Sequence, residues 1–433
     1  MSTETILPID RQAVSAQSKI KQEPQWMSEL RLKGLELAES LELPRLEKTR
    51  IDRWNHEGYG VYRHTDLIQT FNGLPEAAQE LLNEENSANL LVQVNSGLAY
   101  RDVKAELADQ GVLFMDLETA LQQHGDLVQS YFMKVVKQDE NRITALHSAL
   151  WNGGIFLYVP KNVKVDLALQ ALFLSDDAQA TFAPHILIIA EANSSVSFVD
   201  NWISTGDGQR VANGIIEIHV KQGAKVQYAS VHNLGEQVTD LTYRRAIVEN
   251  DGRMEWIGGE LNNGNVLSDT TSILKGAGSS SDAKVICVGT NDQKMNLTTR
   301  AIHIGRSTNS DMITRAVMRD QSTAIINGVT KIEKGATGAN GQQTEKVLML
   351  SPQSRGDANP ILLIDEDDVK CGHAASVGQV NPEQIHYLMS RGIAKSEAQR
   401  LIIYGFLAPV VAEVPIVKLA AKLQELVERK LGQ

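Results

Sequence analysis

The feature that most constrains the fold is a short pattern that recurs along the middle of the chain. The stretches EANSSVSFV, KQGAKVQYA and ENDGRMEWI begin at Glu191, Lys221 and Glu249, so they recur after 30 and 28 residues. In each stretch a polar turn precedes a strand with alternating apolar residues: Val196 and Phe198, Val226 and Tyr228, Met254 and Trp256. A turn-plus-strand unit of this length favours a β-solenoid, in which each coil stacks on the previous one. A β-sandwich whose strands are similar by accident is the alternative.

Segments on both sides of the repeats show helical patterns instead. Residues 24–44, PQWMSELRLKGLELAESLELP, place apolar side chains at helical spacings and end at a proline. Asn381 and Pro382 suit the N-cap and N1 positions of a later helix, Ser396 is the expected cap of the next, and Pro415 is expected to begin the last. We therefore predict a mainly β protein with a mostly helical region at 1–135, a β core at 140–378 and a helical region at 379–433.

Charge and hydropathy exclude several classes of protein. The net charge of -11 argues against general nucleic-acid binding, which needs a basic surface. The longest apolar stretch, near Leu401–Val414, is shorter than the roughly 20 residues of a membrane span. The first residues lack the basic segment and apolar run of a signal peptide. We expect a cytoplasmic protein that binds neither nucleic acid nor membrane.

The usual nucleotide and hydrolase motifs do not occur in the sequence. There is no G-x-x-x-x-G-K-[ST] phosphate loop, no G-x-S-x-G elbow and no H-E-x-x-H zinc helix. The only cysteines, Cys287 and Cys371, cannot supply the four thiolates that usually hold an iron–sulfur cluster. Any cluster would need further ligands from elsewhere.

The segment IDEDDVKCGHAASVGQ, from Ile364 to Gln379, contains the strongest candidate site. If residues 365–373 are extended, Asp367, Val369, Cys371 and His373 share one face of the strand. A Cys-x-His pair can chelate a metal, but two ligands do not complete a site. A packing role in the core stays open, and so does nucleophilic catalysis, although only Lys370 lies near to activate the thiol.

The same segment resembles a known family. DDVKCGHAASVGQ, followed by HYLMSRGIAKSEAQRLIIYGFLAPVV, is similar to the C-terminal signature of the SufB/SufD proteins of the SUF iron–sulfur assembly system. Residues 301–355 and the stretch YRHTDL (62–67) add to the resemblance. Ala374 stands where SufB proteins usually have glutamate, so the chain is closer to the SufD branch. The family usually reads Cys-Ser-His-Gly-Ala-Thr, so Gly372 and its small neighbours depart from the pattern while the cysteine and histidine stay in place.

The resemblance implies a fold and a function. It implies a right-handed parallel β-helix flanked by helical domains, in a scaffold subunit without enzyme activity that acts with SufB and the ATPase SufC. The ends of the SufB and SufD β-helices would meet, and a transient iron–sulfur cluster would form there on His373 with Cys371 beside it. The C-terminal helices, around Tyr404, Phe406 and Leu407, would dock on SufC. The resemblance also implies three further properties as expectations. The chain would support iron acquisition, the complex would bind a reduced flavin, and the isolated chain would form a homodimer.

Two other functions remain as alternatives. In the first, the chain is a structural partner in which Cys371 and His373 only pack. In the second, it is a carbohydrate-active β-helix enzyme that uses the carboxylates of residues 365–368 on calcium or as acid and base.

Overall fold

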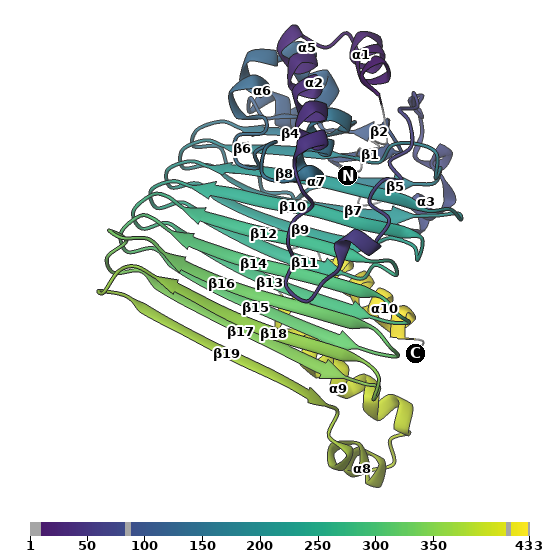
Figure 1. Ribbon diagram of the computed structural model, residues 1–433, viewed down its shortest axis with the longest axis vertical. Helices are drawn as coiled ribbons and strands as arrows, with labels where there is room; N and C mark the ends of the chain where they lie inside the picture. The colour runs from purple at the N-terminus through teal and green to yellow at the C-terminus, as the bar shows by residue number, and fades with distance from the viewer. Residues whose placement is uncertain (1–9, 83–87, 413–416, 432–433) are drawn as a thin grey trace, which may run out of the picture.

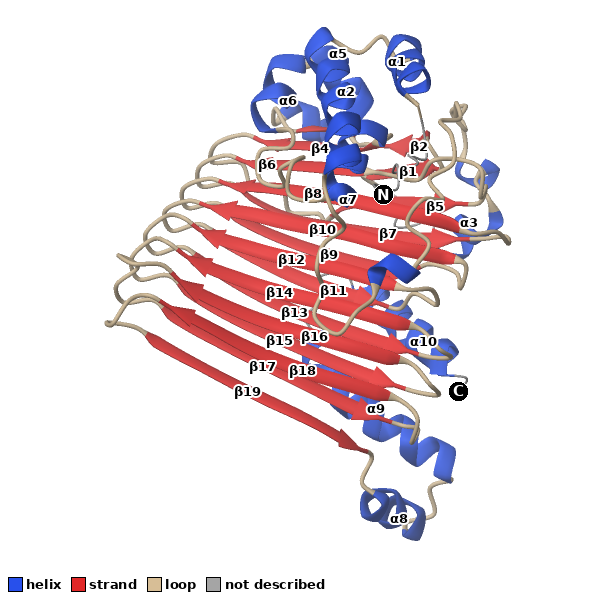
Figure 2. Cartoon of the chain, viewed as in Figure 1, coloured by secondary structure: helices blue, strands red, loops and turns tan. Residues whose placement is uncertain are grey.

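Two long, mainly parallel sheets pack face to face through the molecule (Figure 1, Figure 2). The computed structural model describes residues 10–82, 88–412 and 417–431. The N-terminal elements are α1 (Arg11–Ile20), α2 (Gln25–Ser40), η1 (Ile51–Arg53), η2 (Phe71–Gly73), α3 (Glu76–Leu81), β1 (Leu90–Val94), β2 (Gly97–Asp102), α4 (Ala105–Asp109), β3 (Leu113–Asp116), α5 (Leu117–Gln123), α6 (Gly125–Tyr131) and α7 (Arg142–Leu150).

The two sheets are built from alternate strands of the rest of the chain. The even strands are β4 (Gly154–Val159), β6 (His185–Ala190), β8 (Arg210–Val220), β10 (Val238–Val248), β12 (Val266–Leu274), β14 (Lys294–His303), β16 (Thr323–Ile332) and β18 (Arg355–Ile364). The odd strands are β5 (Leu169–Ser175), β7 (Ser195–Ser204), β9 (Lys225–Asn233), β11 (Arg253–Glu260), β13 (Ser280–Gly289), β15 (Asn309–Met318), β17 (Asn340–Met349) and β19 (Lys370–Gln379). Each strand pairs in parallel with the strand two positions later, so sixteen strands at two per coil make eight coils. The prediction of a β-solenoid is confirmed.

The repeats recognised in the sequence stack in register. Phe198, Tyr228 and Trp256 are direct partners on β7, β9 and β11, and their rings lie inside the solenoid. The centroids of Phe198 and Tyr228 are 5.6 Å apart in a stacked arrangement, and those of Tyr228 and Trp256 are 5.4 Å apart edge to face. Burial of such side chains contributes on the order of 2–3 kcal/mol each, so the column is a main source of stability.

The polar half of each repeat forms the turn between coils. Asn193, Gly223 and Asp251 occupy the third position of the three repeats and all have positive φ, between 56° and 65°. Glycine, asparagine and aspartate are the residues that adopt this left-handed conformation at least cost. The backbone amide of Asn193 donates to the carbonyl of Gln222 in the next turn at 2.9 Å, so the turns stack as the strands do.

Helices cover the N-terminal end of the solenoid. β1 and β2 extend the odd sheet, β3 extends the even sheet, and α2 and α7 pack together above them (Figure 1). The helix expected within 24–44 is present as α2. The opposite end, beyond β18 and β19, carries no further strand of the described residues.

The C-terminal helices are α8 (Pro382–Ser390), α9 (Lys395–Val411) and α10 (Val417–Leu431). Asn381 caps α8 by accepting from the amide of Glu383 at 2.8 Å, and Pro382 stands at N1, as predicted. The expectation for Ser396 is wrong, because the N-cap position is Ala394, two residues earlier, and α9 begins at Lys395 without a side-chain cap. Pro415 lies outside the described residues. α9 and α10 pack along the outer face of the odd sheet.

Candidate functional site at the open end of the solenoid

Cys371 and His373 lie on β19, the last strand of the odd sheet. Their register partners on β17 are Gly341 and Gln343. Followed from strand to strand through β17, β15 and β13, the register partners of His373 lead to Trp256 on β11. Those of Cys371 lead to Met254 on the same strand, and both columns lie on the inner face of the solenoid. Both candidate ligands are therefore the final members of core columns, at the end where no further coil follows.

Cys371 is half-buried at this end. Its side chain packs with Val369 against a small cluster of Ile332, Ala336 and Ala339, as expected for an inward face. Burial raises the pKa of the Cys371 thiol, which is opposite to the shift of an activated cysteine. The other thiol, Cys287, is fully buried several coils away, and both cysteines are free.

The His373 side chain is exposed and makes no hydrogen bond or ion pair with any described residue, while its backbone pairs with β17. A ring nitrogen without an internal partner is available to bind a metal or a group from a second subunit. The two candidate ligands thus stand two residues apart on one strand, one anchored in the core and one facing outward into the space beyond the solenoid.

The acidic segment at 365–368 is a turn rather than a strand. It joins β18 to β19, so the expected sharing of a strand face by Asp367 and Cys371 is wrong. Glu366 accepts from the backbone amides of Gly335 and Asp367 at 2.9 and 3.0 Å, and these bonds, the Gly335 bond first, lower the pKa of its carboxyl. Glu366 therefore holds two neighbouring turns together.

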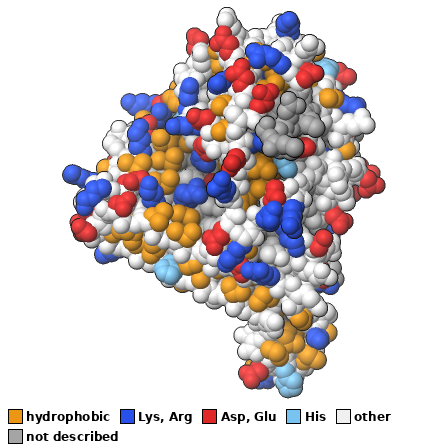
Figure 3. Space-filling model, viewed as in Figure 1, with side chains coloured by type: hydrophobic (Ala, Val, Ile, Leu, Met, Phe, Trp, Pro, Cys, Tyr) orange, Lys and Arg blue, Asp and Glu red, His pale blue; other side chains and the backbone are white. Residues whose placement is uncertain are grey.

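Three exposed apolar side chains on the last two strands form an apolar rim at the open end. Leu363 and Ile364 on β18 and Val377 on β19 are 48%, 42% and 45% exposed. Figure 3 shows hydrophobic side chains along the lower edge of the molecule, over these last strands. Unpaired edge strands with exposed apolar side chains can accept a further strand or another protein.

The residues expected to bind a partner ATPase lie on α9. Leu407 is buried against the odd sheet, and Phe406 packs beside it, with its carbonyl accepting from Arg315 at 3.0 Å. Tyr404 is half-buried under the guanidinium of Arg400. In this arrangement Leu407 faces the solenoid.

Among the described helices, none combines the length and the hydropathy of a membrane span.

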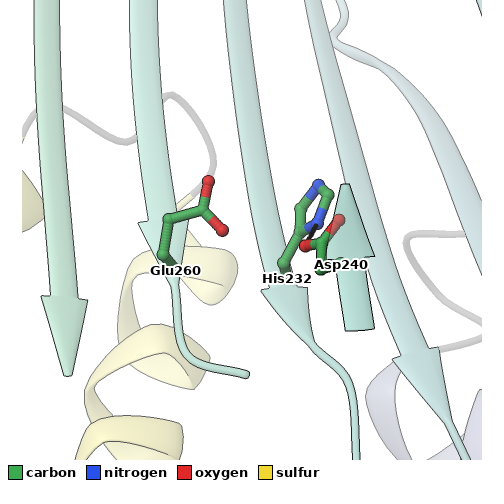
Figure 4. A group of neighbouring side chains, drawn as sticks. All are labelled: His232, Asp240 and Glu260. Carbon is green, nitrogen blue, oxygen red and sulfur yellow. Dashed lines mark hydrogen bonds and ion pairs between the residues drawn. The ribbon is translucent and has the colours of Figure 1, made fainter. Parts of the chain in front are cut away.

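The interior of the solenoid contains a polar cluster that sequence reasoning missed. His232, Asp240 and Glu260 place potential ligand atoms within 4.8 Å of one another, all buried (Figure 4). His232 and Glu260 are 28 residues apart, at the repeat length, and are direct partners on β9 and β11. A polar residue at an apolar repeat position is the sequence signal that could have found them.

Arg244 supplies the positive charge of this cluster. Its guanidinium donates to Glu260 at 3.0 Å and to Nε2 of His232 at 2.7 Å. Because a guanidinium only donates, Nε2 of His232 is the acceptor, and Nδ1 donates to Asp240 at 2.6 Å. The arginine stands where a cation would stand, so the cluster is an internal ion-pair network.

The fold and the end strand together define a class of protein: a β-solenoid with an uncapped end that presents a cysteine and a histidine as candidate metal ligands. Residues 173–406 match the family described as SUF system FeS cluster assembly, SufBD core domain, and residues 21–171 match the SufBD protein N-terminal region. The chain therefore belongs to the SufBD family of iron–sulfur cluster assembly proteins.

Individual relatives agree with this assignment. The chain is 44% identical to the iron–sulfur cluster assembly protein SufD of Bacillus subtilis, over the whole of both chains. It is 31% identical to a SufBD family protein of Staphylococcus epidermidis and 30% identical to one of Staphylococcus aureus, in each case over 92% of this chain and 88% of the relative. The resemblance drawn from the Cys371 segment is confirmed.

Proposed function

We propose that this chain is a scaffold subunit of an iron–sulfur cluster assembly complex, and that a nascent cluster forms on His373 at the open end of the solenoid. The observation that carries the proposal is the position of His373, which ends a core column yet is exposed and has no partner among the described residues. Cys371, half-buried beside it, is the second candidate ligand. The cluster is cargo and passes on to other proteins.

The missing ligands would come from a second solenoid. In the proposed complex, the end of a SufB-type solenoid stacks on β18 and β19. The apolar rim of Leu363, Ile364 and Val377 supports this arrangement, because stacking would remove it from water. The unpaired edge groups of β19 would gain hydrogen bonds at the same time. A homodimer through the same end is the corresponding state of the isolated chain.

ATP hydrolysis belongs to a SufC-type partner in this proposal, and this chain has no catalytic role. The α9 region containing Tyr404, Phe406 and Leu407 would dock on that partner. Because Leu407 faces the odd sheet, docking would use the outer side of α9, where Leu401 is exposed, or would lift the helix away. Closure of the ATPase would then move α9 and shift the solenoid ends. Roles in iron acquisition, a reduced flavin in the complex and a cytoplasmic location remain predictions.

The proposal is tested with the complex co-expressed with SufB and SufC relatives and purified without oxygen. His373→Ala should leave the subunits together, because the side chain is exposed, and should remove most of the iron–sulfur absorbance. His386→Ala changes another exposed histidine, on α8, and is the matched control. An intact His373→Ala complex with the cluster yield of the wild type would overturn the ligand role and leave a purely structural partner.

A further inference from the structure

Glu345 is a buried carboxylate with no visible use in the fold. It lies on the inner face of β17 and is 1% exposed, and its side chain forms no hydrogen bond or ion pair with another described residue. Its Oε2 atom is wholly buried and unpartnered. An unpaired buried carboxylate is costly, so a residue of this kind calls for a ligand or another specific role.

The carboxylate of Glu345 fills the room that a glycine leaves on the opposite sheet. Across the interior stands Gly328, where an added Cβ would lie 1.9 Å from Oε1 of Glu345. On the side toward the open end its register partner is Ala375, which has only a methyl group. Next to it Gln343 is also buried, and its Nε2 atom has no partner although its Oε1 accepts from Thr330. Burial raises the pKa of the Glu345 carboxyl to about 7. This part of the interior therefore holds a titratable carboxyl and unsatisfied polar atoms one coil inside the open end.

His373 is the next histidine position to this buried carboxyl on the neighbouring strand. It is the register partner of Gln343, and Glu345 follows Gln343 by two residues, so Glu345 and His373 are diagonal neighbours on one face of the sheet. Strands about 4.8 Å apart and alternate residues about 6.7 Å apart give a Cα separation of about 8 Å. A glutamate and a histidine side chain extended toward each other can span that distance and share one ion.

We propose that Glu345 is an iron ligand that binds Fe²⁺ together with His373, so that iron enters the assembly site through this chain. Carboxylate oxygen and imidazole nitrogen are donors that suit ferrous iron, and the negative charge of Glu345 balances the buried cation. Binding exchanges water ligands of Fe²⁺ for these two groups, releases to solvent any proton held by the Glu345 carboxyl, and transfers no electron. The inference rests on the proposed function and assigns the first step at the same site.

The test is an anaerobic Fe²⁺ titration of the purified full-length chain, followed by calorimetry and by iron content after dialysis. Glu345→Gln keeps the side-chain volume and removes the charge. We expect at least tenfold weaker Fe²⁺ binding, with a thermal unfolding midpoint no lower than that of the wild type because an unpaired charge is removed. Glu333→Gln, on the turn before β17, is the matched control and should bind as the wild type does.

The outcomes separate this inference from the proposed function. Fe²⁺ binding by Glu345→Gln equal to that of the wild type, or a wild type that retains no iron, overturns the role of Glu345. If His373→Ala still lowers the cluster yield of the complex, only the role of Glu345 fails. If neither change has an effect, both proposals fail. Glu345→Asp keeps the charge but shortens the side chain, and intermediate binding supports direct ligation.

Discussion

Gln343 and His373 are direct register partners in the same inward-facing column, yet Gln343 is 2% exposed and His373 is exposed. The difference arises because the coil that contains β19 covers Gln343, whereas no further coil of the described residues covers His373. The position that elsewhere holds Phe198 and Trp256 in the core becomes, at the last coil, a position that faces solvent. Ending the stack is what turns a structural column into a candidate site.

The apolar rim should control association rather than folding. Val377→Asp places a charge on the uncovered end, and we expect at least tenfold weaker binding to a SufB relative, measured by light scattering and calorimetry. The thermal unfolding of the isolated chain should hardly change, because the site is exposed. Leu167→Asp, at an exposed leucine away from this end, should bind normally. Equal binding by both variants would exclude the end as the interface.

The aromatic column should dominate stability. Trp256→Ala removes a buried indole and its hydrogen bond to Ser272. We expect a loss of about 3–5 kcal/mol in the free energy of unfolding, as for other large-to-small core changes, measured by urea denaturation. Tyr387→Ala, at an exposed tyrosine on α8, should cost less than about 0.5 kcal/mol. A small effect at Trp256 would mean that the column packs loosely.

Arg244 should be essential to the interior network. Arg244→Met leaves the charges of Asp240 and Glu260 without their cation, and breaking a buried pair in this way costs about 3–5 kcal/mol. The comparison is Arg253→Met, whose ion pairs with Glu255 and Asp282 are partly exposed and worth at most about 1 kcal/mol. Denaturation curves of the two variants that coincide would contradict this assignment.

His303 should make the chain sensitive to acid. Burial lowers the pKa of His303 to about 4, so the folded state resists a proton that the unfolded chain binds near pH 6.5. The contribution of His303 to stability is therefore present above pH 6.5 and lost as the pH falls toward 4.

The expected size follows from about 1.4 kcal/mol per pKa unit. Between pH 6.5 and 4, His303→Gln should lose roughly 3 kcal/mol less free energy of unfolding than the wild type, as measured by urea denaturation at each pH. The amide of glutamine can replace the bonds of His303 to Thr308 and Ser310. His386→Gln, at an exposed histidine, should follow the wild type. Parallel pH curves for His303→Gln and the wild type would show that another group causes acid unfolding.

The sequence by itself determined the solenoid, because its signals are local. The polar turns at Asn193, Gly223 and Asp251 need residues that accept a left-handed backbone, and the alternating residues after them need an apolar interior. Both requirements recur once per coil, so they appear as a period in the sequence. The cap of α8 at Asn381 is local in the same way. Ser396 misled because a cap-type residue also fits inside the first turn of a helix.

Only the tertiary structure decided where chemistry can occur. The sequence indicates Cys371 and His373 as a pair of candidate metal ligands. Their place at an uncapped end, however, depends on which strand is last in the stack. Glu345 and the His232 network are spread over residues that only the 28–31-residue register brings together, and nothing near them in sequence marks them. Local sequence specifies the conformation of one coil, whereas a site here depends on which side chains the neighbouring coils place beside it.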